Sequence, residues 1–131
     1  MIAVDASALI AILYGEADGE ALFDRLARED AACITGPTLL EIRMVDHGRS
    51  KTAPGAELDW LLKVGNISCV DFTAEHARIA HAAFLTYGRG SGHRAQLNFG
   101  DCMAYALAKA LDAPLLFKGN DFGLTDIRSA L

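Results

Sequence analysis

The sequence predicts an α/β fold, a three-layer domain in which helices cover both faces of a mostly parallel sheet. Short, continuously apolar runs alternate along the chain with longer segments of helical periodicity, and a strand buried on both faces has such a continuous pattern. The chain has 131 residues, about the size of one domain, so folding can bury roughly two-thirds of the unfolded surface. We therefore expect one domain over residues 1–131.

The first half of the chain begins with a strand that runs directly into a helix. Met1–Val4 is apolar and ends at Asp5, after which apolar residues continue without alternation. A helix with a 3.6-residue period follows, and the proline of Thr35-Gly36-Pro37 marks the start of another, because proline suits the first helical turn. The predicted elements are strand 1–4, helix 6–13, helix 16–28, strand 31–34, a helix from 37 to about 47, and helix 57–64.

The second half continues the alternation and ends on short strands. Thr73 is of the type that caps helices, Ala113-Pro114 turns the chain, and Tyr87–Gln96 is rich in glycine. The predicted elements are strand 67–72, a helix from 74 to about 86, loop 87–96, helix 98–111, strand 115–117 and a short strand near Ile127. Besides the glycine-rich loop, residues 50–56 are the other candidate for mobility.

Charge and cysteine content exclude several classes of protein. The formal net charge is −5 and the pI about 5.2, which argues against passive coating of nucleic acid or of an anionic membrane. The sequence has no apolar run near the roughly 18 residues of a membrane span and no secretory signal pattern, so we predict a cytoplasmic protein without a membrane partner. Cys33, Cys69 and Cys102 are widely spaced in apolar runs, which predicts reduced thiols in the core.

Two acidic residues follow predicted strands. Asp5 ends the first strand and Asp121 comes four residues after the strand 115–117. Ligands of an open parallel sheet bind outside the carboxyl ends of its strands, so both residues should lie at one edge. Each also has an ordinary structural interpretation, Asp5 as the N-cap of the next helix and Asp121 as a turn residue.

Two more carboxylates lie in predicted helices. Glu41 interrupts an apolar stripe formed by residues one turn before and after it, and a carboxylate removed from water needs a cation or hydrogen bonds. An intermolecular or cross-element salt bridge is the alternative. Asp101 comes three residues after Asn98, the spacing of a capping box. That box does not explain Gly100, which costs about 1 kcal/mol of helix propensity unless something must approach the backbone.

Four carboxylates at one edge of a sheet require a cation. Oxygen donors without His or Cys favour Mg²⁺ or Mn²⁺ over zinc. Such an ion activates water and stabilises phosphoryl oxygens, which makes phosphodiester hydrolysis the natural reaction. Ser7 lies beside Asp5 and is more simply a hydrogen-bond partner of a metal ligand than a nucleophile, because no histidine is placed to activate it.

A basic segment departs from the acidic trend of the chain. No acidic residue occurs between Glu75 and Asp101, whereas the loop 87–96 carries Tyr87, Arg89 and Arg94. Such a loop upstream of Asp101 could hold a phosphate backbone, with Tyr87 stacking on a base. An ordinary solvated loop explains the same residues equally well.

The motifs together resemble those of the PIN-domain ribonucleases, and within them the VapC toxins of bacterial VapBC toxin-antitoxin pairs. The resemblance covers nearly the whole chain in order and spacing. The matching segments are Val4-Asp5-Ala6-Ser7-Ala8-Leu9, Glu41 in its helix, Asn98-Phe99-Gly100-Asp101-Cys102, and Pro114-Leu115-Leu116-Phe117-Lys118-Gly119-Asn120-Asp121-Phe122.

The resemblance implies a three-layer α/β/α PIN-like domain, a pocket for Mg²⁺ or Mn²⁺, and endonucleolytic cleavage of RNA. It implies that Asp5 and Asp101 are the principal metal ligands and that Glu41 and Asp121 complete the site. Ser7 and Asn98 would support these ligands. Relatives often carry two acids where this chain has Asn120-Asp121, so the pocket would hold one charge fewer. The resemblance further implies a homodimer neutralised by a VapB-type antitoxin, whose basic arm would suit an acidic toxin.

Two other classes of protein remain as alternatives. A receiver-like signalling domain also has an acidic Mg²⁺ pocket on a doubly wound fold, and Asp71 would then be the phosphoacceptor at the end of the third strand. That scheme gives no role to Glu41 or Asp121 and lacks an acid pair at Asp5. A catalytically inactive binding module is disfavoured because all four acids are present.

Overall fold

The structure, a computed structural model, describes residues 1–49 and 55–131. It confirms the predicted alternation of helices and strands, with bounds within a few residues of those expected. The predicted mobile segment 50–56 falls mostly on residues 50–54, which lie outside the described residues. In chain order the elements are β1 (Ile2–Val4), α1 (Ala6–Leu13), α2 (Gly19–Ala27), β2 (Ala32–Thr35), α3 (Gly36–Arg49), α4 (Ala56–Val64), β3 (Ile67–Val70), α5 (Ala74–Tyr87), α6 (Phe99–Leu111), β4 (Leu115–Leu116) and a short 3₁₀ helix, η1 (Phe122–Leu124).

The sheet has the strand order β3-β2-β1-β4, and all of its strand pairs are parallel. Val4 of β1 stands opposite Leu116 of β4, and the Asp5 backbone N–H donates to the Leu116 carbonyl at 2.9 Å. The predicted short strand near Ile127 is a single bridge between Ser129 and Leu115. The carboxyl ends of β1 and β4 therefore lie side by side.

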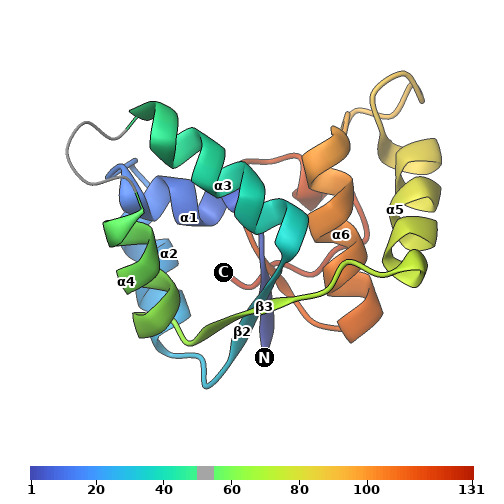
Figure 1. Ribbon diagram of the computed structural model, residues 1–131. Coiled ribbons are helices and arrows are strands. Elements are labelled where there is room, and N and C mark those ends of the chain that lie inside the picture. The colour runs from blue at the N-terminus through green and yellow to red at the C-terminus, as the bar shows by residue number, and fades with distance from the viewer. Residues whose placement is uncertain (50–54) are drawn as a thin grey trace.

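Alternate residues of each strand enter different cores, because successive side chains of a strand point to opposite faces. Ile2 and Val4 pack with α1, α2, α3 and α4 on one face, whereas Ala3 packs with α6 on the other. Figure 1 shows α1, α2 and α4 on the left of the sheet, α5 and α6 on its right, and α3 crossing in front. The three-layer α/β/α prediction is confirmed.

Two local predictions were wrong. Helix α2 begins at Gly19, later than predicted, because the backbone there packs against the end of α1: a Cβ at Gly19 would lie 2.6 Å from the Ala11 carbonyl oxygen. Cys69 is exposed, while Cys33 and Cys102 are buried. Cys69 lies on β3, an edge strand of the sheet, so its apolar neighbours in sequence do not place it in the core.

Candidate active site

Asp5 is a buried carboxylate at the junction of β1 and α1. Its residue is only 5% exposed, and it caps α1 by accepting hydrogen bonds from the Ser7 N–H at 3.0 Å and the Ser7 hydroxyl at 2.5 Å. Both bonds go to Oδ2. The other oxygen, Oδ1, accepts no hydrogen bond within the described ranges. Asp5 is therefore the N-cap of α1, as one interpretation of the sequence predicted, and it also has one oxygen available for a ligand.

Ser7 connects Asp5 to the far end of the chain. While its hydroxyl donates to Asp5, its Oγ accepts the backbone N–H of Lys118 at 3.0 Å. Lys118 directly follows the strand region of β4 and pairs through its ammonium group with Glu16 at 2.5 Å. Sequence reasoning missed Lys118, although its place just after a predicted strand end was a signal. These contacts hold the Asp5 carboxylate in one orientation.

Asp101 and Asn98 form the predicted capping box at the start of α6. The Asp101 N–H donates to Asn98 Oδ1 at 2.8 Å, and the Asn98 N–H donates to Asp101 Oδ2 at 2.9 Å. Asp101 is half-buried. As with Asp5, a hydrogen bond within the fold engages one carboxylate oxygen, Oδ2, and the backbone fixes the orientation of the group.

Glu41 reaches α6 from α3 at the position of Gly100. A Cβ built on Gly100 would lie 2.9 Å from Glu41 Oε2 and 3.2 Å from Oε1. Glu41 as a whole residue is exposed, but its carboxylate lies against the first turn of α6. None of the ion pairs among the described residues includes Glu41, so no cross-element salt bridge within that part of the chain holds it. Gly100 thus makes room for a carboxylate.

Asp121 lies on the exposed turn after β4, immediately before η1. Gly119 gives that turn its shape with a φ of 98°, a backbone conformation that glycine adopts readily. The Asp121 side chain makes no cap hydrogen bond, and its charge acts on Asp101. The turn interpretation is therefore correct, and the carboxylate is also close enough to influence its neighbour in the site.

Burial and neighbouring acids raise the pKa of three of these carboxyl groups. Burial raises the pKa of Asp5 to about 6, against an ordinary value of 3.8; the Ser7 hydrogen bonds oppose this, and the charges of Asp101 and Glu41 add to it. Burial and then Asp101 raise the pKa of Glu41. Burial raises the pKa of Asp101, as does Asp121, while Arg89 lowers it. Four elements therefore bring their acids into one electrostatic cluster, which we call the carboxylate site: Asp5, Glu41, Asp101 and Asp121.

The donor set of the carboxylate site fits Mg²⁺ or Mn²⁺. In residues 1–49 and 55–131, no group of three or more His, Cys, Asp or Glu side chains is close enough to hold a metal ion as it stands. Asp5 and Asp101 nevertheless each have a second oxygen beyond their internal hydrogen bonds, and Gly100 leaves space for the Glu41 carboxylate. Hard divalent cations bind oxygen donors such as carboxylates. A bound cation would also offset the repulsion between the negative charges that raises the pKa of these groups.

The glycine-rich loop is anchored at its base and carries the predicted basic residues. Hydrogen bonds from the Arg89 N–H to the Leu97 carbonyl and from the Leu97 N–H to the Tyr87 carbonyl close the loop. Arg89 and Arg94 are exposed, and Arg89 is close enough to influence Asp101. The Tyr87 ring is half-buried, with His93 edge-on at 4.9 Å and Tyr105 at 6.0 Å between ring centroids, which leaves it little surface for stacking on a base.

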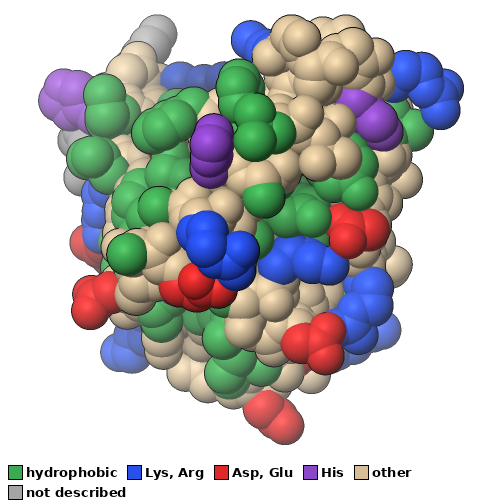
Figure 2. Space-filling view, turned by 90° about the vertical axis from the view of Figure 1, so that its right-hand side faces the viewer, with side chains coloured by type: hydrophobic (Ala, Val, Ile, Leu, Met, Phe, Trp, Pro, Cys, Tyr) green, Lys and Arg blue, Asp and Glu red, His purple; other side chains and the backbone are tan. Residues whose placement is uncertain are grey.

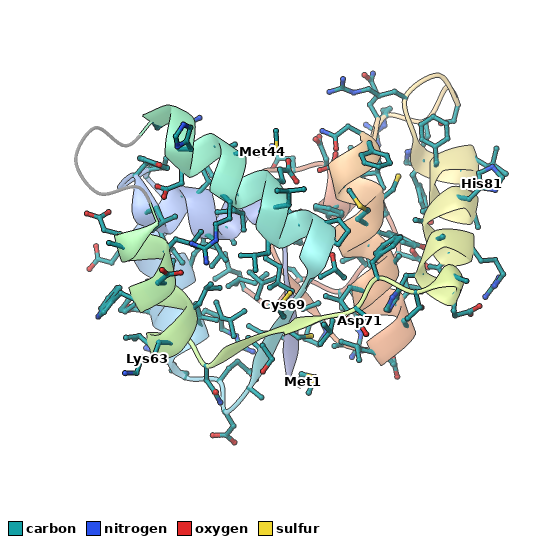
Figure 3. The ribbon with its side chains drawn as sticks, in the orientation of Figure 1. Met1, Met44, Lys63, Cys69, Asp71 and His81 are labelled. Carbon is teal, nitrogen blue, oxygen red and sulfur yellow. The ribbon has the colours of Figure 1, made fainter. Side chains whose placement is uncertain are left out.

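The receiver-like alternative does not agree with the strand order. It needs the acids after the first and third strands to share one pocket, but β2 separates β3 from β1. Asp71 is exposed beyond β3, and Figure 3 shows it at the end of that outer strand. The charges that act on Asp5 come instead from Asp101 and Glu41.

Comparison with known proteins shows the family. The PIN domain matches residues 2–127, and the chain is a PIN-domain protein. It is 44% identical over 128 residues to Ribonuclease VapC28 of Mycobacterium tuberculosis, covering 98% of this chain and 96% of that protein. It is 42% identical over 124 residues to Ribonuclease VapC of Mycolicibacterium smegmatis, covering 95% of each. Within the PIN-domain proteins, the chain therefore belongs to the VapC ribonuclease family.

A solved structure agrees with the fold. The chain is similar to a chain of a toxin-antitoxin complex from Klebsiella pneumoniae, with a TM-score of 0.68 over 93% of this chain and 90% of that one. The two sequences are only 15% identical, so this likeness concerns the fold alone. No helix in the described part of the chain is long and apolar enough to cross a membrane.

Proposed function

We propose that this chain is a metal-dependent endoribonuclease whose carboxylate site binds Mg²⁺ or Mn²⁺, and that residues 1–131 form one nuclease domain. One observation carries the proposal: Asp5, Glu41 and Asp101 come together from three separate elements, and burial and the charges of neighbouring acids, Asp121 among them, raise the pKa of these three carboxyl groups. A bound divalent cation would offset the repulsion between these negative charges. Membership of the VapC ribonuclease family supports RNA as the substrate.

In the proposed mechanism, Asp5, Glu41 and Asp101 hold the cation, with Asp121 completing the site directly or through water. When bound, a divalent cation would polarise the phosphoryl oxygens and activate water for hydrolysis of the phosphodiester. Ser7 keeps Oδ2 of Asp5 engaged and Asn98 does the same for Asp101, so each acid offers its other oxygen. The positive charge of Arg89 acts on Asp101, and the Arg89 guanidinium can bind a phosphate of the RNA.

The proposal is tested by a time course of the purified protein on total bacterial RNA with Mg²⁺, Mn²⁺ or EDTA, beside an Asp101→Asn variant. We expect discrete fragments with either metal, none with EDTA and none with the variant. Asparagine keeps the capping hydrogen bonds of Asp101, so the variant should melt like the wild type. Cleavage in EDTA, or by a folded Asp101→Asn variant, would contradict the metal assignment.

We further propose that the chain is the toxin of a toxin-antitoxin pair, that it acts in the cytoplasm and forms a homodimer, and that a VapB-type antitoxin neutralises it. The relatives named VapC support this role. The acidic net charge of −5 suits a basic antitoxin segment laid over the carboxylate site. Co-expression with its cognate VapB-type antitoxin should restore growth that the chain alone arrests, and Asp101→Asn alone should not arrest growth.

The basic loop yields a separate expectation for binding. Replacing Arg89 and Arg94 together by alanine should weaken RNA binding and make it less dependent on salt. For single strands the slope of log K against log salt is about −0.7 per phosphate contact, so the loss of two contacts should reduce its magnitude by roughly 1.4. The measurement is a binding titration from low to physiological salt with the Asp101→Asn protein.

The matched control removes the same charge elsewhere. Arg28, the residue that caps the end of α2, and Lys63 on α4 are exposed. Both lie in the layer opposite α5 and α6, where Figure 3 labels Lys63. Their double alanine variant has the same net charge as the loop variant and should keep the wild-type slope. Equal slopes for both variants would show that the segment is an ordinary solvated loop that does not contact the RNA backbone.

A further inference from the structure

Lys118 is held at two points along the segment that begins with α1. Its backbone N–H donates to Ser7 Oγ, in the first turn of that helix, at 3.0 Å. Its ammonium group pairs with Glu16, just beyond the end of the helix, at 2.5 Å, and the side chains of Lys118 and Glu16 are each 32% exposed. One residue after β4 is therefore fastened both to the beginning of α1 and to the turn that follows α1.

Glu16 is a firm anchor because its own backbone is hydrogen-bonded on both sides. Its N–H donates to the Ala11 carbonyl at 3.0 Å, and its carbonyl accepts the Gly19 N–H at 2.9 Å. The turn between α1 and α2 thus holds the Glu16 backbone in a set place relative to α1. Glu16 is not one of the four acids of the carboxylate site, and its only ion pair in the described part of the chain is the one with Lys118.

Two acids of the carboxylate site depend on the position of the Lys118 backbone. Because Ser7 Oγ accepts the Lys118 N–H, the hydroxyl proton of Ser7 is directed to Asp5 Oδ2, and Oδ1 is the oxygen that remains for a ligand. Asp121 lies three residues after Lys118 on an exposed turn, and its side chain makes no cap hydrogen bond. The placement of that turn therefore relies on the residue at its start.

Ion pairs without such connections also occur in this protein. Figure 2, which looks onto the α5 and α6 side, shows acidic and basic side chains interspersed there, and on α5 Arg78 pairs with Glu75 at 2.6 Å, both largely exposed. Exposed pairs of this kind contribute little to the stability of a fold. The pair of Glu16 with Lys118 differs because hydrogen bonds lead from it to Asp5.

The surroundings of the Lys118 ammonium group argue against a phosphate of the RNA as its partner. Lys118 borders a cavity of roughly 610 Å³ in which Asp18 is the other charged side chain. A phosphate at this point would meet the carboxylates of Asp18 and Glu16 beside a single ammonium group, and like charges repel. Lys118 is therefore better suited to hold a carboxylate of this chain than to hold RNA.

We propose that Glu16 is a positioning residue for the carboxylate site, and that its ion pair with Lys118 keeps Ser7, and through it Asp5, in the orientation that binds the metal ion. The inference rests on the proposed function of that site. Loss of a group that orients a metal ligand commonly lowers metal affinity or activity by about 10- to 100-fold. Breaking the pair should therefore weaken metal binding while leaving the stability of the fold nearly unchanged.

The first experiment follows the Lys118 backbone in the metal-free protein. Hydrogen–deuterium exchange measured by NMR should show the Lys118 amide protected in the wild type and unprotected in Glu16→Gln, as in Ser7→Ala, which removes the acceptor. The Asp5 amide, which donates to β4, is the internal reference and should stay protected. Glu75→Gln, the same substitution in an exposed ion pair, is the matched control and should exchange like the wild type. Equal protection of the Lys118 amide in Glu16→Gln and the wild type would overturn the inference.

The second experiment measures metal binding without RNA. Titration with Mn²⁺, followed by electron paramagnetic resonance, should give a Kd about tenfold higher for Glu16→Gln than for the wild type, with an unchanged melting temperature. Lys118→Arg, which can keep the ion pair, and the control Glu75→Gln should bind Mn²⁺ like the wild type. An unchanged Kd for Glu16→Gln would overturn the inference alone, whereas a wild type that binds no Mn²⁺ would overturn the proposed function and this inference with it.

Cleavage kinetics separate positioning of Asp5 from direct contact with RNA. At a fixed concentration of Mg²⁺, Glu16→Gln and Lys118→Gln should both lower kcat by about tenfold with little change in KM. The double variant should be no slower than the slower single variant, because both substitutions break one interaction. If Lys118 instead bound a phosphate, Lys118→Gln would raise KM and Glu16→Gln, by releasing the ammonium group, would lower it. Such opposite changes in KM would overturn the inference.

Discussion

An Asp5→Asn variant is expected to lose RNA cleavage and yet to be more stable than the wild type in the absence of metal. Burial and the neighbouring acids raise the pKa of Asp5 to about 6, so at neutral pH the folded protein carries an ionised carboxylate that is less favourable there than in the unfolded chain. One pKa unit corresponds to about 1.4 kcal/mol, which places the destabilisation by the ionised group at roughly 2–3 kcal/mol. Asparagine removes the charge and can still accept the Ser7 hydrogen bonds.

The difference in stability between the wild type and Asp5→Asn should depend on pH. Folded Asp5 binds its proton more tightly than unfolded Asp5, so the free energy of unfolding of the wild type falls as the pH rises from about 4 to about 6. The variant lacks this fall. Its melting temperature should exceed that of the wild type by roughly 5–10 °C at pH 7, and the gap should close near pH 4.

Thermal melts in EDTA at several pH values, together with cleavage assays in Mn²⁺, provide the measurement. Asp71→Asn is the control, because Asp71 follows β3 much as Asp5 follows β1 but is exposed; it should change neither activity nor stability. Addition of Mn²⁺ should raise the melting temperature of the wild type more than that of Asp5→Asn. An Asp5→Asn protein that melts below the wild type at pH 7 would show that the Asp5 charge does not oppose folding.

A Gly100→Ala variant should cut RNA about a hundredfold more slowly while folding normally. The added methyl group would lie 2.9 Å from Glu41 Oε2, closer than real Cβ contacts allow. The obstructing group is the end of a flexible side chain, so Glu41 turns away rather than α6 unfolding. Because alanine is also a better helix former than glycine by up to about 1 kcal/mol, stability should stay equal or increase.

The control for this variant is Gly48→Ala in α3, where an added Cβ meets nothing within 4 Å. It gains the same helix propensity without touching the carboxylate site, so its activity should equal that of the wild type. Comparing kcat/KM and melting temperature for the two variants separates displacement of Glu41 from a general effect of alanine. Full activity of Gly100→Ala would remove Glu41 from the set of functional ligands.

Local sequence patterns predicted most of the fold, because each strand is a short apolar run and each helix has its own capping or breaking residues. They also predicted the capping box at Asn98 and Asp101 and the need of Gly100 for a close approach. They could not identify the approaching group, since Glu41 lies about sixty residues earlier in the chain. Cys69 was misplaced for the same reason: strand order, which decides what an edge strand exposes, is a tertiary property.

The apolar cavity between α3 and α6, which Leu40, Met44 and Phe99 help to line, was missed because each of these residues is ordinary when considered alone. Leu40 and Met44 belong to a helix that has a buried side elsewhere, and Phe99 is one apolar residue in a polar turn. Only the packing of α3 against α6 shows that the three side chains surround one space. Lys118 was missed because its contribution to the site comes from its backbone N–H, to which residue type gives no clue.

The hydrogen bond between Ser7 and Lys118 joins residues 111 positions apart, and β1 is a central strand that pairs with β4 near the end of the chain. During synthesis, therefore, the first strand leaves the ribosome long before its last neighbour exists. Until residues 115–121 emerge, β1 keeps an open edge, Asp5 lacks the contact that Lys118 gives through Ser7, and Asp121 is absent. A nascent chain consequently has no complete carboxylate site, so the RNA cleavage that we propose for this site would begin only when the chain's own translation is nearly finished.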